Sequence, residues 1–219
     1  IFANQKINEA FAQNNMMLSS ANSINWGRLL PQIVYYFSAY CDLMANGEID
    51  FDGEKVNIVV PTGNFGNILA AYYAKKMGLP VNKLICASNS NNVLTEFLNT
   101  GLYNRNRDFH ATISPSMDIL ISSNLERLLY DLTDGDSARV AGWMNELATT
   151  GKYQVSEDVL SRLHEIFYAG YCDDKATKAA IKEIYDVENY LCDTHTAVAV
   201  KVYHQYINDT NDAETPTIV

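Results

Sequence analysis

One segment of this 219-residue chain constrains the fold more than any other, because it places a helical pattern between two strand-length apolar runs. Residues 56–60 and 83–87 have the length and composition of buried strands. Between them, residues 68–77 carry apolar side chains at helical spacing and stop before Gly78 and Pro80. A strand, helix and strand at this spacing require parallel pairing through a right-handed crossover. The segment therefore predicts an α/β fold with a parallel sheet.

The turn between the first strand and the helix is the strongest functional signal. It reads PTGNFGN over residues 61–67 and would present backbone amides at a helix N-terminus, which suits a phosphate group. The glycines alone leave another interpretation open, an ordinary turn in which Gly63 and Gly66 only relieve backbone strain. The turn lacks both the glycine pattern of a dinucleotide fold and the lysine of a Walker loop. A single phosphate monoester is therefore the preferred ligand.

Charge and composition argue against several classes of partner. The formal net charge of −10 would repel a polyphosphate backbone rather than attract it. No apolar stretch approaches the roughly 20 residues that a membrane-spanning helix needs. The four histidines show no metal-binding spacing. We therefore predict no nucleic acid, membrane or metal partner.

The cysteines and the N-terminal segment indicate the compartment. The first 25 residues have neither the basic flank nor the apolar core of a secretory signal. The cysteines form no C-x-x-C pair, which suits buried thiols in a reducing cytosol better than disulfides or zinc. They are Cys41, Cys86, Cys172 and Cys192. We therefore predict a cytoplasmic protein.

The remaining sequence reads mainly as helices. A short helix ends near Asn14, and a long one follows a polar joint that offers N-caps at residues 19–23. Its apolar stripe comprises Leu29, Leu30, Ile33, Val34, Phe37, Cys41 and Met44. Further helices are predicted at 93–99, from a capping box at 123–126, and at 138–149, 157–169, 175–187 and 196–207; 102–112 reads as irregular and 217–219 as a final strand. The polar loop 88–92 could meet a ligand at the sheet edge, but we favour capping of the helix at 93–99.

Five stretches in the same order resemble threonine synthase, a pyridoxal-phosphate (PLP) enzyme of the tryptophan-synthase-like fold, fold type II. They are residues 20–30, 61–67, 75–80, 114–128 and 193–198. The resemblance implies a three-layer α/β fold, an open, twisted, largely parallel sheet with helices on both faces. It also implies two parts: residues 1–25 connect to an absent smaller lobe, and residues 26–219 form the PLP-phosphate-binding large lobe, truncated at its C-terminal end.

The resemblance also implies a site. The cofactor phosphate would be held by Gly63, Asn64, Phe65, Gly66 and Asn67. The substrate side would comprise Asn22, Ser23, Asn25, Arg28 and His195. An alternative is that Asn22 and Ser23 cap the long helix and Arg28 pairs with an acid. For residues 193–195 we favour a helix entry over a contact with the reaction centre.

The family's reaction converts O-phosphohomoserine and water to threonine and phosphate. The lysine that holds the cofactor as a Schiff base lies in the family in an upstream Ser-Phe-Lys-Asp type motif, and no lysine here has that context. Both ends also look cut. We therefore expect no catalytic lysine in this chain, a fragment that is inactive alone, and the remainder of the same polypeptide as its partner. The rivals are another fold type II PLP lyase and a non-catalytic homologue that acts as a binding module.

Overall fold

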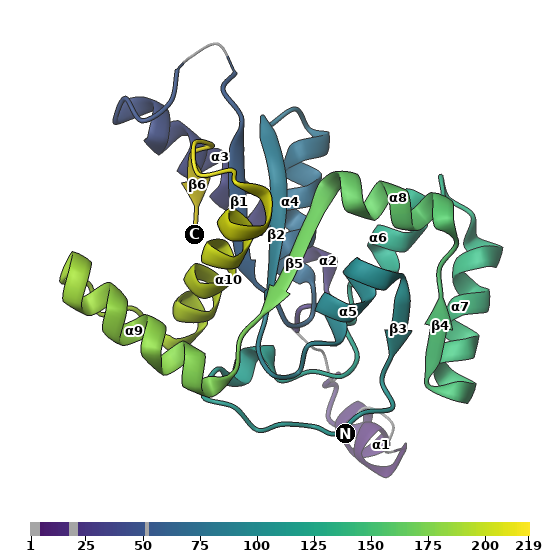
Figure 1. Cartoon of the computed structure of the whole chain (residues 1–219). Coiled ribbons are helices and arrows are strands. Elements are labelled where there is room, and N and C mark those ends of the chain that lie inside the picture. Colours follow the sequence, from purple (N-terminus) through teal and green to yellow (C-terminus); the bar gives the residue numbers. More distant parts are fainter. Residues whose placement is uncertain (1–4, 18–21, 51–52) are drawn as a thin grey trace.

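The computed structural model describes residues 5–17, 22–50 and 53–219 and contains a four-stranded sheet in the order β5-β2-β1-β6 (Figure 1). The strands are β1 (Val56–Pro61), β2 (Val81–Ser88), β5 (Phe167–Tyr171) and β6 (Thr217–Ile218). All three pairings are parallel, with Ile58 opposite Leu84 and Leu84 opposite Phe167. The helix α4 (Gly66–Lys76) connects β1 to β2, so the predicted strand–helix–strand unit is confirmed.

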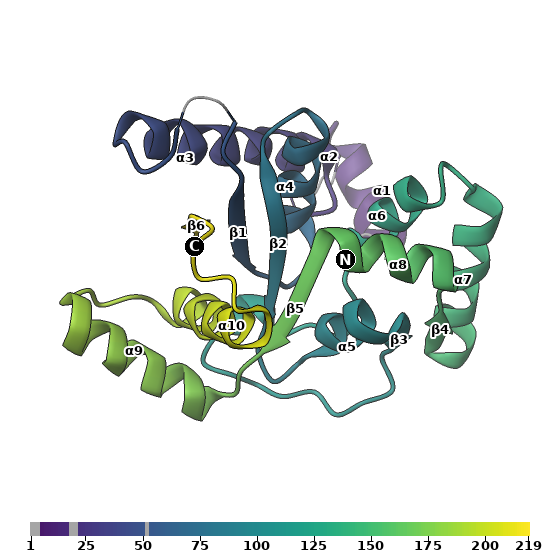
Figure 2. The same cartoon turned by 45° about the horizontal axis from the view of Figure 1, so that its top comes forward.

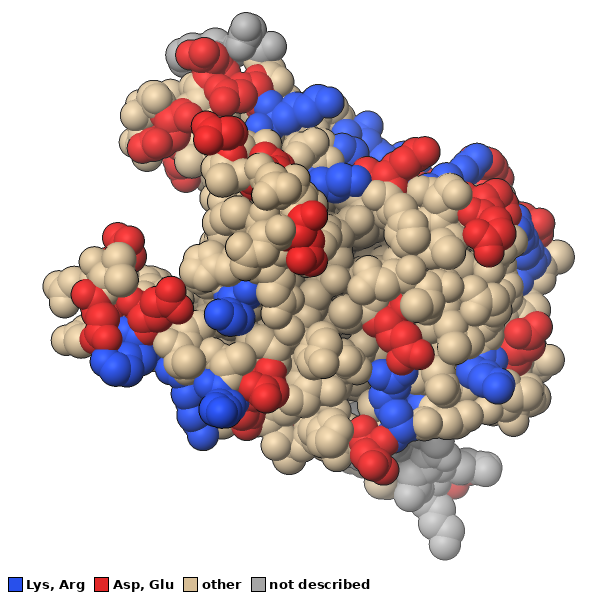
Figure 3. All heavy atoms as spheres, viewed as in Figure 1, with Lys and Arg blue, Asp and Glu red and all other residues tan. Residues whose placement is uncertain are grey.

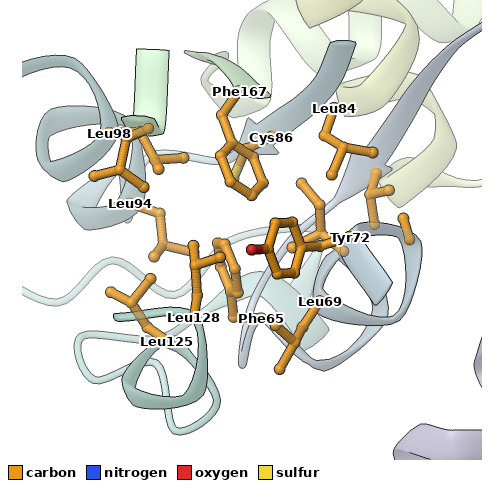
Figure 4. Close-up of a cluster of buried hydrophobic side chains, with 14 of the residues drawn as sticks. Phe65, Leu69, Tyr72, Leu84, Cys86, Leu94, Leu98, Leu125, Leu128 and Phe167 are labelled. Carbon is orange, nitrogen blue, oxygen red and sulfur yellow. The ribbon is translucent and has the colours of Figure 1, made fainter. Parts of the chain in front are cut away.

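Helices cover both faces of this sheet because its side chains alternate between two apolar clusters. Ile58, Leu84 and Cys86 face one side, where they pack with α4 and its neighbours, and Phe65, Leu69, Tyr72 and Phe167 meet in that cluster (Figure 4). Val59 and Ile85 face the other side and pack on α10 (Thr194–Thr210). Figures 1 and 2 show α4 and α10 on opposite sides of the strands. The three-layer α/β prediction is confirmed.

The other elements extend these layers. The helices are α1 (Gln5–Gln13), α2 (Trp26–Leu29), α3 (Ile33–Ala45), α5 (Val93–Thr100), α6 (Leu125–Leu132), α7 (Ser137–Thr150), α8 (Glu157–Ile166) and α9 (Asp174–Glu188). Two 3-10 turns span Leu30–Gln32 and Pro115–Met117. A small antiparallel pair joins β3 (Leu102–Asn104) to β4 (Lys152–Gln154), and β3 lies in the segment 102–112 that was predicted as irregular. Among the described residues, no helix has the length and hydropathy to cross a membrane.

The predicted long helix is wrong in two respects. Pro31 falls in a 3-10 turn that separates α2 from α3, because proline cannot donate the backbone hydrogen bond a continuous helix needs. The buried side then runs through Tyr36 and Tyr40, whose hydroxyls donate to backbone carbonyls, whereas Val34 and Cys41 are exposed. The prediction of a buried thiol therefore fails for Cys41 and is confirmed for Cys86, Cys172 and Cys192.

Two predicted boundaries also differ. The helix expected at 157–169 ends at Ile166, because Phe167 and the residues after it pair with β2. The predicted capping box at 123–126 does not cap α6 as expected. The N-cap residue of α6 is Asn124, and its side chain makes no capping hydrogen bond. The N-caps proposed at residues 19–21 lie outside the described residues.

Acidic and basic side chains intermingle on the face shown in Figure 3, with acidic side chains gathered beside the end of α3.

Candidate functional site

The chain leaves the sheet after Thr62 in a turn whose backbone amides are unused. The Thr62 amide still donates to the Ala87 carbonyl at 2.8 Å, and regular helical bonding begins with Leu69 donating to Phe65 at 3.0 Å. Among the residues that the structure describes, no acceptor receives the amides of residues 63–68. Six consecutive free donors at the N-terminus of an eleven-residue helix favour an anion.

The turn owes its shape to a buried aromatic residue in a left-handed conformation. Phe65 has φ of 63°, a region that side chains other than glycine seldom adopt, and is 1% exposed. The centroid of its ring lies 5.8 Å from the ring centroid of Phe167 (Figure 4). Burial of this ring holds the strained backbone in place. In the alternative interpretation of the turn, Gly63 and Gly66 relieve backbone strain, but neither has positive φ.

Glycine at position 63 is required by a close approach of two loops. A Cβ atom there would lie 2.4 Å from the carbonyl oxygen of Ser116. At Gly66 the tightest neighbour of such an atom is the Asn124 Nδ2, at 3.3 Å. The loop that carries Ser116 therefore fixes one wall of the turn.

Carbonyl groups of the turn are held by donors from residues 122–124. The Ser122 hydroxyl donates to the Gly63 carbonyl at 3.0 Å, and the Asn124 amide and side chain both donate to Asn64, at 3.1 and 2.9 Å. The Tyr36 hydroxyl donates to the Asn67 carbonyl at 3.1 Å. These bonds fix the peptide planes while leaving their N–H groups free.

A cleft of about 840 Å³ lies beside this turn. Three residues predicted for the substrate side, Asn22, Ser23 and Arg28, line it together with residues 61–67. A second cavity, of about 630 Å³, lies between α4, α6 and α7 and contains none of the free amides. We assign the candidate site to the first cleft for that reason.

The other two predicted substrate residues do not line the cleft. The side chain of Asn25 accepts a hydrogen bond from the Gly27 amide at 2.9 Å, so it caps α2. His195 accepts the Ser116 amide at 3.3 Å and lies 3.1 Å from Asp193, measured from Nδ1 to Oδ1. Hydrogen bonds from Thr196 and from the amides at the helix start lower the pKa of Asp193 to about 2. The favoured interpretation of this segment as a helix entry fits these contacts.

Sequence reasoning missed several lining residues, among them Gln32, Tyr35 and Ser116. Gln32 and Tyr35 follow Arg28 at intervals of four and three residues, which places all three on one side of the α2–α3 segment. That spacing was visible in the sequence, but the segment was interpreted by its apolar stripe alone. Ser116 could not be found this way, because a fold contact over about 50 residues brings it to Gly63.

The loop after β2 has a different character. Asn89 and Asn91 are buried and donate to Asp118 Oδ1 at 2.7 and 2.9 Å, while the Thr112 amide donates to Asp118 Oδ2 at 3.0 Å. The N-cap Asn92 makes no side-chain capping bond, so the predicted capping role is wrong. Residues 88–92 instead tie down the loop 110–118. Among the described residues no cluster of three or more histidine, cysteine, aspartate or glutamate side chains is arranged to hold a metal.

Comparison with known proteins identifies the family of the chain. No protein-family model matches the chain. The human protein named threonine synthase-like 1 is 50% identical over 194 residues, covering 88% of this chain and 26% of that protein. Threonine synthase of Saccharomyces cerevisiae is 43% identical over 208 residues, covering 89% of this chain and 40% of the enzyme. The chain belongs to the threonine synthase family.

A solved structure extends the relation to three dimensions. PLP-bound threonine synthase from Brucella melitensis matches with a TM-score of 0.87 and 40% identity, covering 100% of this chain and 44% of that one. The chain therefore has the fold of fold type II threonine synthases. It spans between a quarter and about two fifths of the length of the threonine synthase relatives it matches.

Proposed function

We propose that this chain supplies the cofactor-phosphate site of a PLP-dependent threonine synthase, which converts O-phosphohomoserine and water to threonine and phosphate. The observation that carries the proposal is the run of free amides at residues 63–68, in a turn whose residues 63–67 line the cleft, in a family whose Brucella member is PLP-bound. In this proposal the cofactor phosphate is held by Gly63, Asn64, Phe65, Gly66 and Asn67.

The chemistry of the cleft fits a phosphate monoester. Its described lining contains no aspartate or glutamate, although the chain as a whole carries a formal charge of −10. The only charged side chain in that lining is Arg28. Hydrogen bonds from amides to a charged acceptor each contribute roughly 1.5–3 kcal/mol, and the dipole of α4 adds to them. Such a turn can retain a doubly charged ester without a dedicated lysine or metal.

The opposite wall is proposed to receive the substrate. Arg28, with Asn22 and Ser23, offers a charged group and polar groups to the phosphate or carboxylate of O-phosphohomoserine. When bound, the cofactor's pyridine ring would serve as the electron sink for carbanions beside the substrate nitrogen. This chain's own residues bind and orient; Gln32 and Tyr35 continue the same wall.

The proton-transferring lysine has no counterpart among the described residues of this cleft. Lys83 donates to the carbonyls of His164 and Glu165, both at 2.8 Å, beside the N-terminal end of β5 and away from the turn. We therefore propose that this chain is inactive alone and acts with the remainder of a longer cytoplasmic polypeptide. In that polypeptide residues 1–25 would connect to a smaller lobe and residues 26–219 would belong to the large lobe.

The test is a turnover assay with PLP and O-phosphohomoserine, following threonine and released phosphate. The full-length gene product should release both in equal amounts, and Arg28→Met should raise its KM strongly while leaving it folded. This chain alone should release neither. Deamination of serine or threonine by the full-length product would favour another PLP lyase, and no reaction with any of the three would favour a binding module.

A further inference from the structure

Asn124 joins two loops that the proposed function assigns to different ligands. Its side chain is fully buried at the start of α6. The Nδ2 group donates to the Ser23 carbonyl at 3.1 Å and to the Asn64 carbonyl at 2.9 Å, and its backbone amide also donates to Asn64. Ser23 lies on the substrate wall and Asn64 in the phosphate turn, so one amide group spans both.

Arg127 fixes the orientation of that amide. Its Nη1 group donates to the Asn124 Oδ1, and its Nη2 group donates to the Ile24 carbonyl at 2.6 Å. A guanidinium can only donate, so the Asn124 oxygen must face Arg127 and the NH₂ group must face the two carbonyls. Arg127 thereby holds both Asn124 and the loop that carries Asn22 and Ser23.

The covalent structure of the turn lets an anion act on this bridge. The Asn64 carbonyl, which accepts from Asn124, belongs to the same peptide group as the free Phe65 amide. An anion that accepts from the Phe65 amide polarises this peptide group and makes its carbonyl a stronger acceptor. The effect reaches the Asn124 side chain and, through it, Ser23.

We propose that Asn124, oriented by Arg127, is a positioning residue through which occupation of the phosphate turn orders the substrate loop 22–25. The inference rests on the proposed function, since it requires that the turn bind a phosphate group. It assigns Asn124 no contact with substrate or cofactor. Its role is to make the two sites depend on each other.

The test is a titration of this ¹⁵N-labelled chain with inorganic phosphate, followed by amide chemical shifts. In the unmodified chain phosphate should shift the amides of residues 63–67 and also those of Ser23 and Ile24. Arg127→Lys keeps the charge but cannot hold both carbonyl and amide oxygens, so the shifts at Ser23 and Ile24 should disappear. Asn124→Ala should do the same and weaken phosphate binding about tenfold. Tyr130→Phe is the control: it lies one turn along the same helix and, like Arg127→Lys, leaves the net charge of the chain unchanged. It should retain both sets of shifts.

The outcomes separate the two proposals. Shifts at 63–67 that propagate to Ser23 in the unmodified chain and in Arg127→Lys alike would overturn the positioning role while leaving the phosphate site intact. So would shifts confined to residues 63–67 in the unmodified chain. An unmodified chain with no shift in the turn would overturn the proposed function itself. If Asn124→Ala is unfolded by circular dichroism, Arg127→Lys still decides the question.

Discussion

Two loops leave the same edge of the sheet, after the adjacent strands β1 and β2. They differ in whether their hydrogen-bond donors have partners within the protein. The turn 63–67 lines the cleft and keeps its backbone amides free. In the loop 89–92, by contrast, the side chains of Asn89 and Asn91 donate hydrogen bonds to Asp118 and to neighbouring oxygens. A position at the carboxyl edge of a parallel sheet is common to both.

The difference shows which property marks a binding loop. A closed network such as the one around Asp118 lowers the free energy of the fold, because each buried polar group has a partner. Free amides contribute no such stability and are held in place by bonds to their carbonyls and by the buried Phe65 ring. Changes in the first loop should therefore alter ligand binding, and changes in the second should alter stability.

The largest effect is expected from Gly63→Val. The added Cβ would lie 2.4 Å from the Ser116 carbonyl, so the turn must move away from the loop 114–117. Phosphate binding should be lost, and overpacking should lower the free energy of unfolding by about 1–3 kcal/mol. Gly142→Val on α7, where the added Cβ would meet no described atom within 4 Å apart from the adjacent residues and the helix's own backbone, is the matched control and should bind normally. Normal phosphate binding by Gly63→Val would contradict the conclusion that the close approach of the Ser116 loop requires glycine at position 63.

Asp118→Ala should produce the reverse pattern. The Thr112 amide would lose its acceptor, and Asn89 and Asn91 would each lose one of several acceptors, which costs about 1–3 kcal/mol of stability. Phosphate affinity should change far less than in Gly63→Val. Denaturant unfolding and phosphate titration of the same samples measure both quantities. A loss of binding as large as for Gly63→Val would end the distinction between the two loops.

The same carboxylate predicts a pH dependence. Burial alone would raise the pKa of Asp118, but hydrogen bonds from Thr112, Asn89 and Asn91 outweigh it and the pKa lies below its usual value. A lowered folded-state pKa contributes stability above the unfolded pKa of about 3.9, and this contribution is lost as pH falls through the folded value. The free energy of unfolding should therefore fall less between pH 6 and pH 3 in Asp118→Asn than in the unmodified chain. Identical pH profiles would contradict this assignment.

A smaller effect is expected from Tyr36→Phe, which removes the hydroxyl that donates to Asn67. One lost hydrogen bond of this kind lowers stability by about 0.5–1.5 kcal/mol. Because Asn67 is the second residue of α4, the amides of residues 69–71, where helical bonding begins, should also exchange faster with solvent. Hydrogen exchange monitored by NMR tests this. Unchanged exchange would mean that Tyr36 does not brace the turn.

The smallest effect is expected from Asn64→Ala. Asn64 is exposed and meets its neighbours through its carbonyl, which alanine retains. Phosphate affinity should stay within about twofold and stability within about 0.5 kcal/mol. A loss of tenfold or more would show that the side chain, and not the backbone, recognises the anion.

The sequence predicted what is local and missed what depends on distant partners. The β1–α4–β2 unit and the turn within it are contiguous, so periodicity and the positions of the glycines were sufficient to locate them. The strand β5 was interpreted as the end of a helix, since only its pairing with β2 distinguishes Phe167 and the residues after it from a continued apolar pattern. The contacts of Ser116 and Asn124 with the turn join residues about 50 to 60 positions apart, which no local pattern encodes.

The most direct test of the account compares pyridoxal phosphate with pyridoxal, its counterpart without the phosphate. Both are titrated into the ¹⁵N-labelled chain while the amide resonances are followed. The account predicts that pyridoxal phosphate shifts the amides of residues 63–67 in a saturable way, that inorganic phosphate shifts the same amides more weakly, and that pyridoxal leaves them unchanged. Equal shifts with pyridoxal, or no shift in the turn with pyridoxal phosphate, would contradict the assignment of this turn as the cofactor-phosphate site.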